Sequence, residues 1–189
     1  MTTTLVLGGA RSGKSRFAQA QAESLFAPLT LIATAQAFDD EMAQRIARHR
    51  ADRDARWRVI EEPYDLAAAL RAACAPERAV VVDCLTLWLS NLMHAGRDLA
   101  AAGDALLAAL ASAQGAVFLV SNEVGLGLVP DNPLGRAFRD AQGWLNQSVA
   151  QISARVVFVA AGLPLTLKDE TAPAFPAPGA PFEARSSGQ

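Results

Sequence analysis

A Walker A phosphate loop close to the start of the chain limits the possible folds more than any other feature. Residues 8–15 read G-G-A-R-S-G-K-S, which is a glycine, four further residues and then Gly-Lys-Ser. The apolar run Thr4–Leu7 precedes the loop, and a helical pattern over Ser15–Phe26 follows it. This strand–loop–helix setting predicts a P-loop α/β fold. A chance glycine-rich turn is disfavoured because every motif position and both flanking elements are present.

The residues of the loop have distinct chemical tasks. Gly8 and Gly13 let the backbone curve closely around an anion. The loop amides and the N-terminus of the following helix direct partial positive charge at phosphate groups. Lys14 reaches the outer phosphates, and Ser15 supplies a hydroxyl ligand for Mg²⁺. We therefore expect a nucleotide site, with Mg²⁺ as its cofactor, made of Gly8, Gly9, Ala10, Arg11, Ser12, Gly13, Lys14 and Ser15.

The composition is that of a globular protein without a basic surface. The chain has 189 residues, of which 51% are hydrophobic and 19% charged, and its net charge is −2. A nucleic-acid partner is therefore not indicated. No apolar run approaches the ~20 residues that span a bilayer, and no signal-peptide pattern precedes the first strand, so we expect a cytoplasmic protein without membrane insertion. Cys74 and Cys84 are too few for a disulfide framework, and we expect them to be small core residues.

Short β-branched runs alternate with helical patterns along the chain. The expected strands are Thr4–Leu7, Leu29–Ala33, Arg58–Glu61, Ala79–Asp83, Ala116–Ser121, Arg155–Ala160 and a short one near Pro164–Lys168. The expected helices are Ser15–Phe26, Asp39–Asp54, Tyr64–Ala73, Leu85–His94, Asp98–Ala113 and Pro133–Ser153. This alternation predicts one RecA-like P-loop NTPase domain over residues 1–170, with a mainly parallel sheet flanked by helices on both faces. Residues 171–189 are rich in Pro, Ala, Gly and Ser, which predicts a flexible tail.

His49 lies among arginines on the predicted helix Asp39–Asp54. Arg45, His49 and Arg53 recur at i, i+4 and i+8 and so share one stripe of this helix. Nearby positive charge disfavours the imidazolium form and keeps the ring neutral and nucleophilic, and arginines bind phosphate oxygens. The spacing fits a nucleophilic or phosphate-binding histidine, but by itself it favours an ordinary surface helix with a partly buried histidine.

Two carboxylates end predicted strands, at the edge where ligands bind in parallel sheets. The run Ala79–Asp83 is the Walker B pattern, an apolar strand whose final aspartate holds Mg²⁺ directly or through water. We expect Asp83 to lie beside the phosphate loop and to share the metal with Ser15. Many buried strands end in an aspartate, and it is the preceding Walker A loop that favours the Mg²⁺ role. Glu61 ends the preceding strand, either as a site residue or as a surface charge at a strand end.

A polar segment follows the strand Ala116–Ser121. It begins S-N-E-V-G and continues through Asp131 and Asn132. Segments at this edge of a sheet commonly contact substrates. We therefore regard Asn122 and Glu123 as residues of a candidate substrate loop.

Taken together, these motifs resemble those of the bifunctional adenosylcobinamide kinase / adenosylcobinamide-phosphate guanylyltransferase family. The resemblance runs in order through residues 4–168 and rests on G-G-A-R-S-G-K-S, D-D-E-M-x-x-R-I-x-x-H-R-x-x-R, W-R-V-I-E-E-P, V-V-V-D-C-L-T-L-W-L-S-N-L, V-S-N-E-V-G-x-G-x-V-P-D-N, R-x-F-R-D-x-x-G-x-L-N-Q and A-G-L-P-L-x-L-K. The motifs after the phosphate loop are more specific than the loop itself.

The resemblance implies two reactions of cobalamin biosynthesis. A kinase step transfers the γ-phosphoryl group of ATP or GTP to the aminopropanol hydroxyl of adenosylcobinamide. A second step transfers GMP from GTP to that phosphate, giving adenosylcobinamide-GDP and pyrophosphate. In the family GMP passes through a covalent bond to a histidine, and the matching residue here is His49, while Lys14 neutralises charge that builds on the transferred group.

The resemblance also implies the nucleotide contacts and the assembly. The residues that match the family's contacts are those of the phosphate loop together with Ala33, Thr34, Ala35, Arg50, Ala51, Asp52, Arg53, Glu61 and Asp83. The usual assembly of the family is a homotrimer, and we expect the same here.

Two other functions also fit the phosphate loop. One is a different small-molecule kinase, in which His49 only binds phosphate and no covalent protein–nucleotide species forms. The other is a nucleotide-dependent switch or assembly protein that turns over slowly and makes no cobinamide product. The dense polar signature of Asn122–Asn132 argues against the switch.

Overall fold

The computed structural model describes residues 2–25, 27–36 and 55–170. The strands in these ranges are β1 (Thr2–Gly8), β2 (Leu29–Ala33), β3 (Trp57–Glu61), β4 (Ala79–Asp83), β5 (Ala116–Asn122), β6 (Arg155–Ala160) and β7 (Leu163–Asp169). The helices are α1 (Lys14–Glu23), α3 (Leu66–Ala73), α4 (Leu85–His94), α5 (Leu99–Ser112) and α6 (Pro133–Ile152). The predicted helix Asp39–Asp54 and the predicted tail lie outside the described residues, so the predicted domain boundary stays a prediction.

The strands form one sheet in the order β3-β2-β4-β5-β1-β6-β7. Strands β1 to β6 are parallel, and β7 pairs with β6 in the antiparallel direction. The chain reverses between β6 and β7 through Ala161 and Gly162, whose φ angles of 51° and 81° are those of a two-residue hairpin turn. Strand β5 lies between the Walker A strand β1 and the Walker B strand β4, as in RecA-like P-loop folds. The predicted fold class is confirmed.

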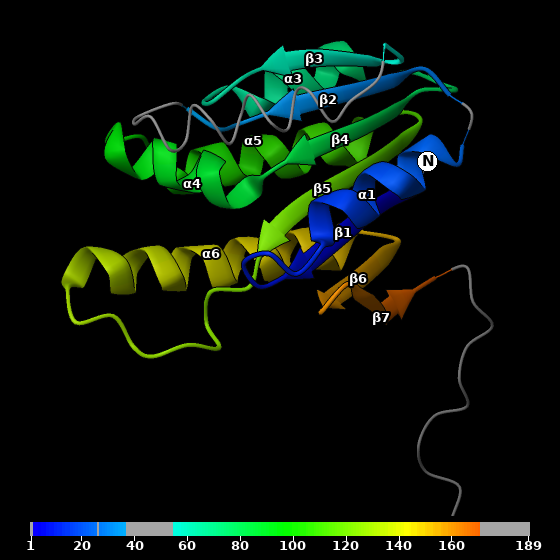
Figure 1. Cartoon of the computed structure of the whole chain (residues 1–189). Coiled ribbons are helices and arrows are strands. Elements are labelled where there is room, and N and C mark those ends of the chain that lie inside the picture. Colours follow the sequence, from blue (N-terminus) through cyan, green and yellow to red (C-terminus); the bar gives the residue numbers. More distant parts are fainter. Residues whose placement is uncertain (1, 26, 37–54, 171–189) are drawn as a thin grey trace, which may run out of the picture.

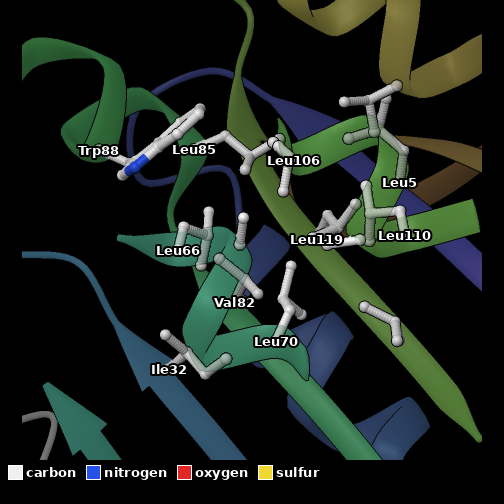
Figure 2. Packing of buried hydrophobic residues seen from close by; sticks show 14 of the residues in the cluster. Leu5, Ile32, Leu66, Leu70, Val82, Leu85, Trp88, Leu106, Leu110 and Leu119 are labelled. Carbon is white, nitrogen blue, oxygen red and sulfur yellow. The ribbon is translucent and has the colours of Figure 1, made fainter. Parts of the chain in front are cut away.

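Helices cover both faces of the sheet, as predicted. Helix α1 packs on one face through Ala18 and Ala22, and α3, α4, α5 and α6 pack on the other (Figure 1). Figure 2 shows the larger core cluster on that second face, which includes Leu5, Ile32, Val82 and Leu119 from the strands and Leu66, Leu70, Leu85, Trp88, Leu106 and Leu110 from the helices. The strands are apolar on both sides because both sides are covered.

Most predicted elements are present, but some ends differ. Helix α3 begins at Leu66, two residues later than predicted, because Glu62 Oε1 accepts hydrogen bonds from the amides of Tyr64 and Asp65 at 2.9 and 2.8 Å. The Asp65 carboxylate then caps the helix by accepting from the Ala68 amide at 3.2 Å. None of the helices in the described ranges combines the length and apolar character that a bilayer crossing requires.

Candidate active site

The phosphate loop connects β1 to α1 and is closed by its own hydrogen bonds. Gly13 precedes the helix with a φ of 96°, a left-handed conformation that favours glycine. The Ser12 amide donates to Gly9 O at 3.3 Å. The side chain of Lys14 is buried, and its Nζ donates to Gly9 O at 3.0 Å. The loop thus holds its lysine over the backbone that is expected to surround the phosphates.

Close packing explains why the first position of the motif is a glycine. A Cβ on Gly8 would lie 2.5 Å from Ser12 Oγ and 2.5 Å from the carbonyl oxygen of Val159. A Cβ on Gly9, in contrast, would meet nothing within 4 Å. The backbone of β6 therefore approaches the loop closely at Gly8, and a side chain at that position would push the two apart.

The turn between β6 and β7 supports the phosphate loop from outside. The Gly162 amide donates to Ser12 O at 2.8 Å, and a Cβ on Gly13 would lie 3.3 Å from Gly162 Cα. Sequence reasoning did not identify Gly162 as part of the site. The available signal was the Ala-Gly pair between two strand patterns, within the motif A-G-L-P-L-x-L-K, but nothing local to that pair indicates that the turn touches the phosphate loop.

Asp83 ends β4 at the same edge of the sheet as the phosphate loop, but one strand lies between β4 and the phosphate-loop strand β1. Strand β5 lies between β4 and β1, with Val120 in register with Asp83 and Asn122 in register with Gly8. The residue next to the first glycine of the loop is therefore Asn122 rather than Asp83. The predicted Walker B residue therefore lies across the end of β5 from the phosphate loop.

The residues at this edge fit a Mg²⁺ ion that is bound together with a nucleotide. Asp83 Oδ2 is buried and has no hydrogen-bond partner among the described residues, which is costly unless a cation or a water satisfies it. The described ranges hold no group of three or more His, Cys, Asp and Glu side chains arranged for a metal. Mg²⁺ at nucleotide sites needs only one or two protein carboxylates, because phosphates and waters supply its other ligands. Asp83, with the hydroxyl of Ser15 on α1, fits that requirement.

Cys84 begins the turn into α4 and is a neutral structural thiol. Its Sγ accepts from the Leu87 amide at 3.5 Å. Burial, and secondarily the negative charge of Asp83, raises the pKa of this thiol to about 11. Burial also raises the pKa of Cys74 to about 11. Cys84 is buried as predicted, whereas Cys74 is only partly buried.

The candidate substrate loop begins beside the phosphate loop. The Glu123 amide donates to Gly8 O at 3.1 Å. The Asn122 amide donates to Thr86 Oγ1 at 2.7 Å, and Asn146 Nδ2 donates to Asn122 O at 3.1 Å. Asn122 is therefore held from both sides by α4 and α6, while Glu123 Oε1 accepts from the Gly125 amide at 2.6 Å.

A buried polar cluster behind Asn122 joins β5 to α6. Gln142 Nε2 donates to Ser121 Oγ at 3.0 Å and to Asn146 Oδ1 at 2.9 Å, and Ser121 Oγ donates to Asn146 Oδ1 at 2.7 Å. All three side chains are buried. Sequence reasoning did not single out Gln142 or Asn146: the motif R-x-F-R-D-x-x-G-x-L-N-Q specifies Asn146, whereas Gln142 occupies one of its unspecified positions.

The remaining predicted contacts lie on β2 and β3, on the far side of β4 from the phosphate loop, or outside the described residues. Ala33 pairs with Asp83 on one side and with Glu61 on the other. Three strands, β2, β4 and β5, separate Glu61 on β3 from the phosphate-loop strand β1. Thr34 is fully buried against the β4–α4 junction. His49 and residues 50–53 lie outside the described residues, so their roles stay predictions.

The matching family model and the curated relatives point to the same family. Residues 4–167 match the family described as cobinamide kinase / cobinamide phosphate guanyltransferase. The bifunctional adenosylcobalamin biosynthesis protein CobP of Pseudomonas aeruginosa is 51% identical over 168 residues, covering 88% of this chain and 97% of that protein. The corresponding CobU protein of Salmonella typhimurium is 42% identical over 180 residues, covering 87% and 98%. Among solved structures, the flagellar accessory protein FlaH of Methanocaldococcus jannaschii gives a TM-score of 0.49 at 11% identity, covering 89% of this chain and 78% of that chain.

Proposed function

Because the chain belongs to the cobinamide kinase / cobinamide phosphate guanyltransferase family and is a transferase, we propose that it catalyses two successive reactions of cobalamin biosynthesis. It first phosphorylates adenosylcobinamide with ATP or GTP, and it then transfers GMP from GTP to the new phosphate. The observation that carries this proposal is the folded phosphate loop with the Asp83 carboxylate at the same edge of the sheet. The proposed substrates are those that the family resemblance implies.

In the kinase step, the hydroxyl oxygen of adenosylcobinamide forms a bond to the γ-phosphorus as the bond from that phosphorus to the β–γ bridging oxygen breaks. The nucleoside diphosphate leaves, and the hydroxyl proton passes to solvent. Lys14 and the loop amides hold the phosphate oxygens while negative charge shifts toward the leaving group. We propose that Ser15 and Asp83 hold Mg²⁺, which when bound would neutralise charge on the phosphates.

In the guanylyl step, we propose His49 as the nucleophile. A ring nitrogen of neutral His49 bonds to the α-phosphorus of GTP, the bond to the α–β bridging oxygen breaks, and pyrophosphate leaves. A phosphate oxygen of adenosylcobinamide phosphate then attacks the same phosphorus, and the bond to His49 breaks. Two displacements through a protein nucleophile replace one difficult transfer. Residues 50–53, Ala33, Thr34, Ala35 and Glu61 are proposed to contact the nucleotide by correspondence with the family.

We also propose that three copies of the chain assemble and that the assembly is cytoplasmic, where ATP and GTP are available. Leu163, Leu165 and Leu167 on the edge strand β7 are 73, 60 and 57% exposed. Exposed apolar residues on an edge strand favour contact with another protein surface, and the number three comes from the family resemblance. Light scattering is expected to give three times the chain mass of 19.9 kDa.

The mass of the intact protein after incubation with GTP and Mg²⁺ tests the guanylyl step. One added GMP is expected, labile to acid because a phosphorus–nitrogen bond to imidazole hydrolyses readily when protonated. His49→Ala is the matched control and is expected to remain unmodified. Absence of the adduct while GTP still binds would reject the guanylyl transfer through a histidine and leave a small-molecule kinase.

An adduct that persists in His49→Ala would keep the covalent route but assign it to another nucleophile. His94, the other histidine of the chain, is the last residue of α4, and its Nδ1 lies 2.8 Å from Ser90 O. This arrangement suits a residue that closes a helix. We therefore expect His94→Ala to form the adduct normally.

A further inference from the structure

Thr34, the first residue after β2, is bound through all of its polar groups to neighbouring elements. Its hydroxyl accepts a hydrogen bond from the Cys84 amide at 2.8 Å and donates to the Cys84 carbonyl at 2.7 Å. Its own amide donates to Asp83 O at 3.1 Å, and Asn91 Nδ2 on α4 donates to Thr34 O at 2.8 Å. Thr34 is 0% exposed. The side chain therefore has no polar atom left over for a ligand in this structure.

Three of these four contacts bind the backbone of two consecutive residues, Asp83 and Cys84. The ladder between β2 and β4 ends at the pair Ala33 and Asp83, and one further backbone hydrogen bond, from the Thr34 amide to Asp83 O, follows that pair. The Thr34 hydroxyl replaces the ladder there by binding both backbone groups of Cys84. Asp83 is thus held on its C-terminal side while its Oδ2 stays buried and without a partner among the described residues.

We propose that Thr34 is a positioning residue for Asp83, and that its hydroxyl holds the β4–α4 junction so that the Asp83 carboxylate is presented to the divalent cation of the bound nucleotide. The inference rests on the proposed function, in which Asp83 binds that cation. This positioning role differs from the direct nucleotide contact that the family resemblance implies for Thr34. A positioning residue acts through Asp83, so it strengthens nucleotide binding only when the cation is present. Groups that orient a metal ligand change metal affinity by about 10- to 100-fold when they are removed.

The experiment measures how much Mg²⁺ strengthens nucleotide binding. The affinity of the full chain for α,β-methylene GTP, which cannot transfer GMP, is measured by calorimetry in Mg²⁺ and in EDTA, and the ratio of the two affinities is the Mg²⁺ effect. Thr34→Val removes the hydroxyl and keeps the shape. It is expected to reduce the Mg²⁺ effect by about 10-fold or more, with little change of the affinity in EDTA. Thr34→Ser keeps the hydroxyl and is expected to retain most of the effect.

The chain offers a matched control for the same substitution. Thr3 is also a buried strand threonine, 2% exposed, and its Oγ1 has no hydrogen-bond partner within the described ranges. Thr3→Val is therefore expected to leave both affinities unchanged. If Thr34→Val does not fold, Thr34→Ala replaces it, because the smaller side chain leaves room for a water to bind the Cys84 amide and carbonyl. Such a water is not attached to β2, so the same loss of the Mg²⁺ effect is expected.

Asp83→Asn separates failure of this inference from failure of the proposed function. If Asp83→Asn loses the Mg²⁺ effect and Thr34→Val keeps it, the positioning role is wrong and the cation site stands. If Thr34→Val weakens binding equally in Mg²⁺ and in EDTA, Thr34 contacts the nucleotide or supports the fold in general, and the positioning role is again wrong. If Asp83→Asn also keeps the full effect, the proposed cation site itself is wrong and the inference fails with it.

Discussion

Two neighbouring glycines of the phosphate loop differ in what a side chain would meet, and this difference gives a test at the scale of single residues. In Gly8→Ala the new Cβ would lie 2.5 Å from the Val159 carbonyl oxygen, which belongs to β6 and cannot rotate away. We expect the free energy of unfolding in urea to fall by about 1–3 kcal/mol, the usual cost of overpacking.

Gly9→Ala is the matched control, because a Cβ there has no atom within 4 Å. We expect its free energy of unfolding to stay within about 0.5 kcal/mol of the unsubstituted protein. Equal losses in the two variants would show that the loop requires glycine for its backbone conformation and not for close packing against β6.

The two cysteines give a prediction about chemical reactivity. Burial raises the pKa of Cys74 and of Cys84 to about 11, and the thiolate is the form that reacts with disulfide reagents. At pH 8 we expect each thiol to react about 100-fold more slowly in the native protein than in guanidinium chloride, with Cys84 the slower because it is buried. A colorimetric thiol assay with Ellman's reagent measures both rates. A native thiol that reacts as fast as the unfolded chain would contradict the raised pKa values.

Single residues were predictable where a local pattern carries their chemistry. Lys14 and Asp83 were assigned from motifs whose spacing is local in the sequence, and the structure places both at the carboxyl edge of the sheet. The support given by Thr34 was not predictable, because its hydrogen-bond partner Cys84 lies 50 positions away. A threonine at the end of a strand has no feature in sequence that distinguishes a nucleotide contact from a bond to another strand.

At the scale of elements, the contact between α6 and β5 depends on buried hydrogen bonds as well as on apolar packing. Gln142 is 0% exposed and donates to Ser121 Oγ and Asn146 Oδ1. Gln142→Ala would leave these acceptors poorly satisfied and create a cavity, so we expect a loss of about 2–4 kcal/mol in the free energy of unfolding.

Gln147 on the same helix is exposed and provides the matched control. Gln147→Ala is expected to change the free energy of unfolding by less than about 0.5 kcal/mol. Comparable stability of the two variants in urea would contradict a stabilising role for the buried cluster.

Element types were predictable because periodicity and length reveal them, whereas some element ends were not. The apolar runs of β4 and β5 are buried on both faces, and their β-branched composition distinguishes them from helices. The start of α3 depends on two carboxylates. Glu62 binds the amides of Tyr64 and Asp65 before the helix, and Asp65 binds the Ala68 amide in its first turn. Hydrophobic periodicity does not report which carboxylate binds these amides.

At the scale of the whole molecule, the order of the strands was the least predictable property. Alternating strands and helices predict a parallel sheet, but they do not determine that β5 inserts between β1 and β4. That insertion places Asn122 beside Gly8 and moves Asp83 one strand away. Motifs therefore indicated candidate residues of the site, while its geometry depended on contacts between distant parts of the chain.

The end of the folded unit is open to a direct test by truncation. Lys168 on β7 donates from Nζ to Ala150 O, Gln151 O and Ser153 O at 3.3, 3.0 and 2.7 Å, and so binds the carbonyls that end α6. The Glu170 amide donates to Ala154 O at 2.9 Å. A chain cut after Glu170 keeps these bonds, and we expect its thermal midpoint to stay within about 2 °C of the full chain, with unchanged affinity for GTP.

A chain cut after Gly162 removes β7 and is the contrasting variant. It exposes the edge of β6 and leaves the last carbonyls of α6 without the lysine. Because hydrogen bonds to a charged group contribute about 1.5–3 kcal/mol each, we expect the midpoint to fall by about 10 °C or more. Calorimetry measures both variants. If the cut after Glu170 also lowers the midpoint or weakens GTP binding, residues 171–189 contribute to the folded unit and the predicted boundary at residue 170 is wrong.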